Sequence, residues 1–274
     1  MDHPSSKSSV EASIESWQDA IESALKSSGV ELVQKVLVLR ETASTQEAAS
    51  RAAGSTPTLV VADRQTAGRG RLGRPWIQGS SESDSGLGIA ATFALPGCQV
   101  PPPRLSLAAG LAAHEACARS LGSRDVLGLR WPNDVVERGG AQRKVAGVLV
   151  EAVGPLILVG IGINVLHEQD DFPGSLAERA VSLRQLGSRC SRLSVLLALI
   201  GELDRALRAS PEEITTRWSA LDTLVGSRRT LIQAGRRYQG TVRSIQPSSH
   251  IELETSEGVV QLPSLTTSLV HDEN

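Results

Sequence analysis

Apolar residues recur along the first half of the chain at spacings that switch between helical and strand-like. Ile14, Trp17, Ile21 and Leu25 follow one another at intervals of three or four residues, which predicts an amphipathic helix ending at Gly29. Short β-branched, apolar runs then predict buried strands separated by further helices. We expect strands at 36–39, 58–62, 87–94 and 127–130, and helices at 44–54 and 105–121.

The longest apolar run, at 145–166, reads VAGVLVEAVGPLILVGIGINVL and is long enough to cross a bilayer. Glu151 and Asn164 interrupt this run, and Gly154-Pro155 marks a turn near its middle. Two buried strands joined at that turn explain the pattern better than a membrane span does.

The pattern of apolar and polar residues changes from helical to strand-like after Leu221. Two further helices are expected before that point, at 193–207 and 212–221. Beyond it, short runs such as RTLIQ, YQGTVRSI, IELET and GVVQL alternate with turn residues, which is typical of a small all-β barrel. We therefore place a domain boundary near 222–225. The predicted units are an N-terminal tail and helix (1–35), a catalytic domain (36–222) and a C-terminal barrel (223–274).

Charge and cysteine content argue against a basic nucleic-acid-binding protein and against a disulfide-bonded secreted protein. The 274 residues include 28 basic and 30 acidic ones, and the net charge of -2 provides no global attraction to nucleic acid or membrane. The three cysteines are widely spaced and form no CxxC, as expected for reduced thiols in the cytoplasm. The five histidines show no ligand spacing, so no zinc site is expected. The N-terminal MDHPSSKSSV lacks the apolar segment of a signal peptide.

One stretch, RQTAGRGRLGRPW at 64–76, carries the first chemical signal. Gly68, Gly70 and Gly73 match G-x-G-x-x-G, but a dinucleotide-binding loop must open directly into a helix. Here Pro75-Trp76 and a Ser-rich stretch follow instead. Glycine amides and arginine forks together suit phosphate or carboxylate oxygens, so we predict a loop that folds over a polyanionic ligand. A solvated basic loop and a nucleic-acid contact are the alternatives.

Three polar motifs accompany this loop. RWPND at 130–134 offers an asparagine for phosphate and an aspartate for Mg²⁺, although an ordinary Asn-Asp turn is favoured when the motif is taken alone. Lys144 opens an apolar strand, where it either snorkels to solvent or presents a point charge to an anion. GIGIN at 160–164 lets the backbone pass close to a ligand.

Together these segments resemble one family, the biotin protein ligases (biotin–acetyl-CoA-carboxylase ligases). The resemblance runs from Ser44 to the C-terminus, and the motifs occur in the family's order. They are STQ at 44–46, QTAGRGRLGRPW at 65–76, WPND at 131–134, KVAGVLVE at 144–151 and GIGIN at 160–164. The resemblance implies an α+β fold: a mixed β-sheet with helices on one face, like class II aminoacyl-tRNA synthetases, and a small C-terminal SH3-like barrel.

The resemblance also implies a two-step reaction. The carboxylate of biotin attacks the α-phosphate of MgATP, which gives biotinyl-5′-AMP and pyrophosphate. A lysine of a biotin carboxyl carrier protein, from acetyl-CoA carboxylase or a related carboxylase, then attacks the mixed anhydride. Cationic groups and Mg²⁺ would neutralise the two anions that meet in the first step. A glycine-rich loop that closes would keep water from the intermediate.

Residue roles follow from the resemblance position by position. The residues expected to bind biotin are Ser44, Thr45, Gln65, Gly68, Arg69, Lys144 and Gly147. Those expected to bind ATP are Arg71, Arg74, Trp76, Arg130, Asn133 and Asn164. The catalytic set is Lys144, Arg69 and Arg71, with Lys144 bridging the biotin carboxylate and the α-phosphate. Asp134 is expected near Mg²⁺.

The sequence departs from the family pattern at three places. Arg130 stands where the family usually has lysine, LGIA at 87–90 replaces a typical L-Y-L-S, and LTTSLV at 265–270 lacks the glutamate and arginine of the usual C-terminal motif. About 35 residues precede the first core strand, which is too few for a winged helix-turn-helix. We therefore expect a cytoplasmic ligase that binds neither DNA nor membrane, and leave the oligomeric state open, a homodimer included.

Two rival functions stay open at this stage. Lipoate ligases and octanoyl transferases share the fold but lack the G-R-G-R-x-G-R loop. A non-catalytic nucleic-acid-binding module built on the arginine loop is the other alternative, and the near-neutral net charge disfavours it.

Overall fold

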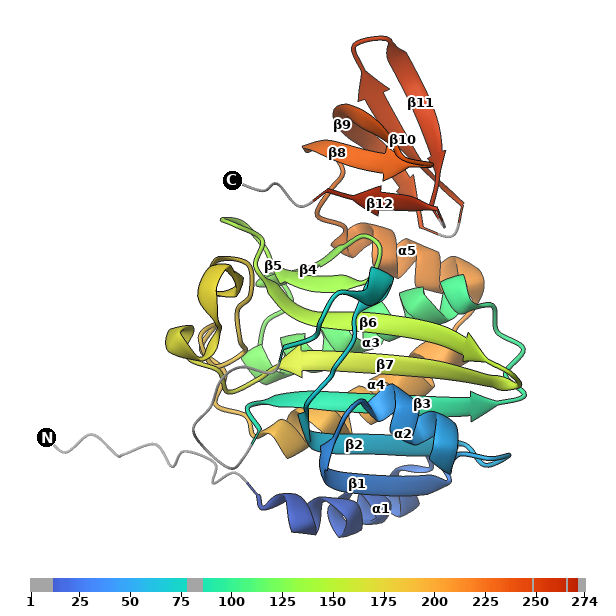
Figure 1. Ribbon diagram of the computed structural model, residues 1–274, viewed down its shortest axis with the longest axis vertical. Coiled ribbons are helices and arrows are strands. Elements are labelled where there is room, and N and C mark those ends of the chain that lie inside the picture. The colour runs from blue at the N-terminus through green and yellow to red at the C-terminus, as the bar shows by residue number, and fades with distance from the viewer. Residues whose placement is uncertain (1–11, 78–85, 248, 265, 271–274) are drawn as a thin grey trace, which may run out of the picture.

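Two β-sheets form the frame of the protein, in a computed structural model that describes residues 12–77, 86–247, 249–264 and 266–270 (Figure 1). The larger sheet has seven strands. In spatial order these are β1 (Lys35–Thr42), β2 (Thr58–Gln65), β3 (Gly88–Pro96), β7 (Leu156–Asn164), β6 (Lys144–Val153), β5 (Asp134–Glu137) and β4 (Leu127–Arg130). β1 and β2 are parallel, and the other neighbouring pairs are antiparallel. The predicted α+β class and mixed sheet are confirmed.

Helices cover both faces of this sheet. The helices are α1 (Trp17–Ser28), α2 (Thr45–Ala52), α3 (Pro102–Leu121), α4 (Arg192–Arg208) and α5 (Pro211–Leu221). In β2, Leu59 and Val61 pack into the large core that contains α1, α3, α4 and α5. Val60, between them, packs against Ala48 and Ala49 of α2 on the opposite face. The expectation of helices on one face is therefore wrong for α2, because β2 is apolar at consecutive positions and needs cover on both sides.

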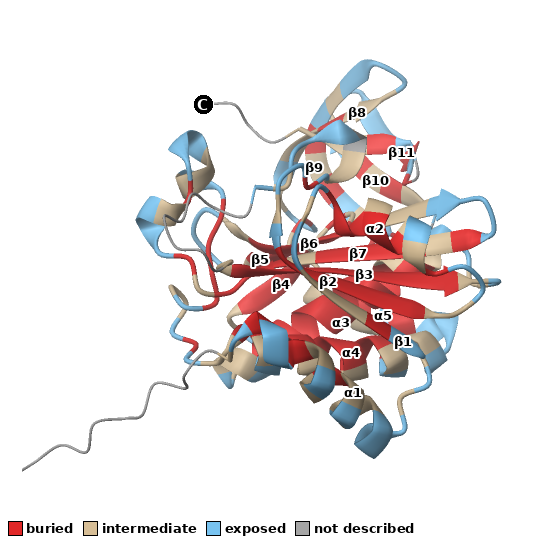
Figure 2. Ribbon diagram, turned by 60° about the horizontal axis from the view of Figure 1, so that its bottom comes forward, coloured by how far each residue is buried: buried red, intermediate tan, exposed pale blue. Residues whose placement is uncertain are grey.

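Burial is concentrated in the sheet and in the helices behind it (Figure 2). Two helix ends match their sequence signals: Gly29 and Gly122 both adopt φ of +67° after α1 and α3, a conformation that favours glycine. The apolar run at 145–166 forms the β6–β7 hairpin, as predicted, and turns at Gly154. No helix in the described part of the chain is long and apolar enough to cross a membrane.

A second sheet follows the predicted boundary at 222–225. All of its neighbouring strands are antiparallel. In spatial order they are β11 (Gly258–Pro263), β10 (His250–Thr255), β9 (Arg236–Gln246), β8 (Arg228–Gln233) and β12 (Thr267–Leu269). Among the described residues β11 and β12 are edges that do not pair with each other, so a closed SH3-like barrel is not confirmed. The division into three domains stays a prediction.

The described residues also form short 3-10 helices. They are η1 (Ile14–Ser16), η2 (Arg71–Gly73), η3 (Gln169–Asp171) and η4 (Gly174–Glu178). Residues 1–11 of the predicted tail, and 78–85 of the Ser-rich stretch after Trp76, lie outside the described residues.

Candidate active site

A cavity of about 650 Å³ opens on the face of the large sheet that also carries α2. Its floor is a row of residues in register across four strands: Ala90 of β3, Gly162 of β7, Gly147 of β6 and Asp134 of β5. Directly paired residues point to the same face of a sheet. Three of the four have small side chains or none, which leaves room above the strands for other groups.

The Arg/Gly stretch closes one side of this cavity as a compact loop. The amide of Trp76 donates to the carbonyl of Gly68 at 2.8 Å, and the amide of Gly70 donates to the carbonyl of Arg74 at 2.7 Å. The loop therefore folds back on itself around η2 and does not open into a helix, as the dinucleotide-binding motif would require. A methyl group on Gly68 would lie 2.7 Å from the carbonyl oxygen of Trp76, so the fold-back needs glycine there.

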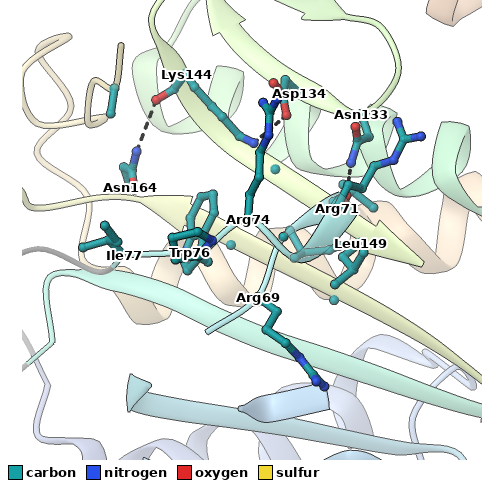
Figure 3. A pocket seen from close by; sticks show the side chains of 18 of the residues that line it. Arg69, Arg71, Arg74, Trp76, Ile77, Asn133, Asp134, Lys144, Leu149 and Asn164 are labelled. Atoms are coloured by element: carbon teal, nitrogen blue, oxygen red, sulfur yellow. Dashed lines mark hydrogen bonds and ion pairs between the residues drawn. The ribbon is translucent and has the colours of Figure 1, made fainter. Parts of the chain in front are cut away.

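The indole ring of Trp76 is in close contact with the glycines of the floor, and its position in the cavity is seen in Figure 3. A Cβ atom built on Gly162 would be 2.4 Å from the indole ring, and one built on Gly147 would be 3.3 Å away. The Nζ atom of Lys144 lies 5.4 Å from the ring centroid, within the range of a cation–π contact. Trp76 of the arginine loop therefore contacts residues of two other sequence motifs, the strand that begins at Lys144 and GIGIN.

Lys144 has a fixed backbone and a paired side chain. Its amide donates to the carbonyl of Arg179 at 2.8 Å, and its carbonyl accepts from the amide of Val181 at 3.0 Å and from Asn164 Nδ2 at 3.2 Å. Its Nζ atom lies 2.6 Å from Asp134 Oδ1. The first residue of β6 is thus held in place while its charge faces the cavity (Figure 3).

Asp134 accepts from two cations. Besides Lys144, the Arg130 guanidinium lies 3.1 Å from Oδ2. Burial by itself would raise the pKa of the Asp134 carboxyl, but the charges and hydrogen bonds of Lys144 and Arg130 outweigh it and hold the pKa below its ordinary value. The group is therefore an ionised carboxylate at neutral pH.

Four more arginines line the cavity: Arg69, Arg71, Arg74 and Arg179. Burial lowers the pKa of the Arg71 guanidinium, and the charge of Asp134 acts in the opposite direction. Arg69 forms an ion pair with Glu47 of α2 at 3.4 Å. The cations outnumber the carboxylates that face them, so this part of the cavity suits a ligand with more than one negative charge.

The start of α2 provides an uncharged polar end. Gln65 Oε1 accepts from both the amide of Thr45, at 2.8 Å, and its hydroxyl, at 3.0 Å. Thr92 Oγ1 donates to the Thr45 hydroxyl at 2.9 Å. The Ser44 hydroxyl is buried with no hydrogen-bond partner in the described part of the chain. An unpaired buried hydroxyl is costly, so a ligand with polar, neutral groups would find a partner here.

The cavity brings together the residues that the sequence singled out. All of them except Gly68 line it, and Gly68 is in close contact with Gln65 and Trp76, which do. Sequence reasoning missed other lining residues: Gln46, Leu149, Phe172, Ser175, Leu176, Arg179, Ser268 and Leu269. Gln46 stands inside the STQ motif and Leu149 inside KVAGVLVE, whereas Ser268 and Leu269 of β12 belong to LTTSLV, the segment that departs from the family's C-terminal motif.

The fit of Asp134 to a magnesium ion can be judged from its contacts. Both carboxylate oxygens bond to cationic nitrogens, and no cluster of three or more His, Cys, Asp or Glu occurs within the described ranges. Mg²⁺ prefers a shell of oxygen ligands and would have to displace one of these cations. The arrangement does not fit a preformed metal site, and a role of Asp134 near Mg²⁺ stays an untested prediction.

Comparison with known proteins agrees with this arrangement. A model of the biotin/lipoate A/B protein ligase family matches residues 38–166. The bifunctional ligase/repressor BirA of Bacillus spizizenii is 30% identical over 241 residues, which is 82% of this chain and 71% of that one. The biotin–acetyl-CoA-carboxylase ligase of Mycobacterium tuberculosis is 31% identical over 205 residues, 72% of this chain and 73% of its own length. The chain belongs to the biotin protein ligase family.

Solved structures of the family support the same assignment. The biotin protein ligase of Aquifex aeolicus, in complex with biotin and ATP, superposes with a TM-score of 0.73 at 29% identity. The match covers 87% of this chain and all of the Aquifex chain. Membership of the biotin protein ligase family makes the chain a ligase, as the motifs predicted, and disfavours a non-catalytic nucleic-acid-binding module.

Proposed function

We propose that this biotin protein ligase attaches biotin to a lysine of a biotin carboxyl carrier protein in two steps, through biotinyl-5′-AMP. The observation that carries the proposal is the position of Lys144. Its Nζ atom stands at Asp134 in a single cavity that is neutral and polar at α2 and lined with arginines elsewhere. The names of the relatives and the biotin and ATP in the Aquifex complex support this choice of substrates.

The uncharged end suits the ureido ring of biotin. This head group has neutral donors and an acceptor, which match the free hydroxyl of Ser44 and the Thr45–Gln65 pair. The apolar body of biotin would lie beside the Trp76 ring, which itself covers Gly162 and Gly147. Its carboxylate would then extend towards Lys144, a point charge suited to an anion.

The arginine-lined end suits ATP. Arg71 and Arg74 would bind phosphate oxygens, and Arg69 would cover both ligands from the same loop. Asn133 and Asn164 donate through Nδ2 to main-chain carbonyls, Asn133 to that of Val148. Those bonds leave their side-chain oxygens for the nucleotide. Mg²⁺ would enter with the ATP phosphates, in keeping with its usual mode of binding.

The first step joins two anions. A carboxylate oxygen of biotin attacks the α-phosphorus, a new P–O bond forms, and the bond to pyrophosphate breaks. Lys144 would exchange its contact with Asp134 for the carboxylate and the α-phosphate, where it neutralises the charge that develops between them. In the second step the acceptor ε-amine attacks the acyl carbon, and AMP leaves. The loop at 68–76 would exclude water in between.

The test is biotin-dependent exchange of labelled pyrophosphate into ATP. We expect exchange with biotin, little with lipoate or octanoate, and collapse in Lys144→Ala. Lys26→Ala, which removes an exposed lysine of α1, is the matched control and should exchange like the wild type. Exchange with lipoate or octanoate but not biotin would make the chain a ligase of the alternative acid. Full activity of Lys144→Ala would remove that residue from the mechanism. Mass spectrometry of a carrier domain then tests the second step.

A further inference from the structure

The loop between β5 and β6 contains a residue that reaches both the cavity and the second sheet. Gln142 has φ of +52°, in the left-handed region that residues other than glycine seldom adopt. Its carbonyl accepts from Arg130 Nη1 at 3.0 Å. Its side chain points to other elements, so one residue contacts the active-site arginine and the C-terminal part of the chain.

Only a few hydrogen bonds hold the Arg130 guanidinium in its position. One nitrogen bonds to Asp134 Oδ2 at 3.1 Å and another to the Gln142 carbonyl, while Nε is buried with no partner in the part of the chain that the structure describes. These two bonds therefore fix its plane. A lysine, the family's usual residue here, has a single nitrogen and no rigid fork with which to bridge both acceptors in this way.

The Gln142 side chain is tied to the C-terminal part of the chain by two hydrogen bonds. Nε2 donates to the carbonyl of Thr223 at 3.2 Å, and Oε1 accepts from Arg229 Nη2 at 3.1 Å. Thr223 lies at the predicted domain boundary, and its amide donates to the Leu129 carbonyl at 3.0 Å. Arg229 belongs to β8 of the second sheet. The contacts thus form a chain from β8 through Gln142 and Arg130 to Asp134.

We call the contact between β4 and residues 220–223 the seam, and it is tightly packed. A Cβ atom on Gly128 of β4 would lie 2.4 Å from the Thr223 methyl group and 3.0 Å from the Leu221 carbonyl. Gln142 and Arg229 are both half-buried. The C-terminal segment is therefore packed tightly against β4 where it leaves the first sheet, and a displacement of the second sheet would act on Gln142 through its bonds to Thr223 and Arg229.

We propose that Gln142 is a positioning residue that couples the C-terminal sheet to the nucleotide end of the cavity, by holding the Arg130 guanidinium against Asp134. The proposal rests on the proposed function in naming ATP as the ligand at that end. It makes the second sheet part of the machinery for ATP affinity through one identified contact chain, and it gives a structural reason for arginine at position 130.

The experiment uses Gln142→Gly, because glycine adopts φ of +52° without strain and keeps the carbonyl while removing both side-chain bonds. Arg229→Met breaks the same chain from the other end. Each variant should raise the apparent KM for MgATP in pyrophosphate exchange about tenfold, the factor that corresponds to losing one hydrogen bond that supports a charged group. The Kd for biotin, measured by calorimetry, should not change. The double variant should be no worse than the more affected single variant.

Arg138→Met is the matched control. Arg138 bonds to the carbonyls of Leu127 and Ala220 across the same seam and makes no described contact with Arg130. An unchanged KM for MgATP in folded Gln142→Gly would overturn the proposal, as would additive effects in the double variant or an equal effect of Arg138→Met. The proposed function fails separately, if wild-type exchange does not require biotin. The ratio of variant to wild-type KM can then be measured with whichever acid supports exchange.

Discussion

Gly162→Ala should lower the activity by displacing the Trp76 ring, although the substitution leaves Trp76 itself unchanged. The new methyl carbon would lie 2.4 Å from Trp76 Cε2 and 2.5 Å from Cζ2. Ordinary contact begins near 3.4 Å, so the ring must move by about 1 Å. Overpacking of this kind costs roughly 1–3 kcal/mol of folding stability. A misplacement of about 1 Å in an active site can cost on the order of 100-fold in rate.

The assay is biotin-dependent pyrophosphate exchange, with the unfolding midpoint measured on the same samples. We expect exchange to fall about 100-fold while the protein stays folded at 25 °C. Gly201→Ala is the control, because a Cβ there meets no atom within 4 Å and a helical glycine-to-alanine change stabilises by roughly 1 kcal/mol. Adding Gly162→Ala to Trp76→Ala should cost little more than Trp76→Ala alone. Near-normal exchange by Gly162→Ala, or full additivity in the double variant, would refute the steric argument.

Two further outcomes follow from charged groups. Arg192 of α4 and Asp63 of β2 form a buried ion pair at 2.6 Å with side chains 2% and 5% exposed, so Arg192→Met should lower the free energy of unfolding by about 3–5 kcal/mol in urea titrations. Arg208→Met, which breaks an exposed pair with Asp204, should leave it unchanged, and equal losses would contradict the burial argument. Asp134 has a folded-state pKa below its ordinary value of 3.8, so its ionisation contributes stability that is present above that value and is lost as the pH falls further. Unfolding measured from about pH 4 downwards should therefore depend less on pH in Asp134→Asn than in the wild type, and an identical slope would mean that Asp134 is not held ionised by Lys144 and Arg130.

Local periodicity predicted most of the helices and strands that form. It was less successful in predicting where each one begins and ends, and which face of the sheet a helix covers. The helix expected at 105–121 begins at Pro102, because proline is tolerated in the first turn, where its missing amide is not needed. β5, which is only four residues long, escaped prediction because DVVE is too short for an alternation to appear, and it forms only between β4 and β6. Nothing local in STQEAASRAAG says which face of the sheet it will cover.

The residues of the site could be predicted where they stand in a recognisable motif. They could not be predicted where they come from distant parts of the chain and have no such motif. Lys144, Asp134 and the arginine loop stand in stretches with unusual polar residues among glycines or apolar neighbours. Arg179 follows a short 3-10 helix with no such pattern, and Ser268 belongs to β12, a strand of the second sheet that is far from the other lining residues in the sequence. The partners of Gln142 are 81 and 87 residues away, so only the folded chain reveals them.

The floor of the cavity also limits which changes in chain length this protein can tolerate. β6 and β7 pair without interruption from Ala146 opposite Ile163 to Val153 opposite Leu156. Because side chains alternate between faces, deleting one residue between the turn and Gly162 would shift the register and place Ile163, a branched residue, beneath Trp76 in place of Gly162. Insertions and deletions in this hairpin should therefore be confined to the Gly154-Pro155 turn or come in compensating pairs. The floor sets no such restriction on the loop at 138–143, where the contacts of Gln142 with Arg130, Thr223 and Arg229 are what limit a change in length.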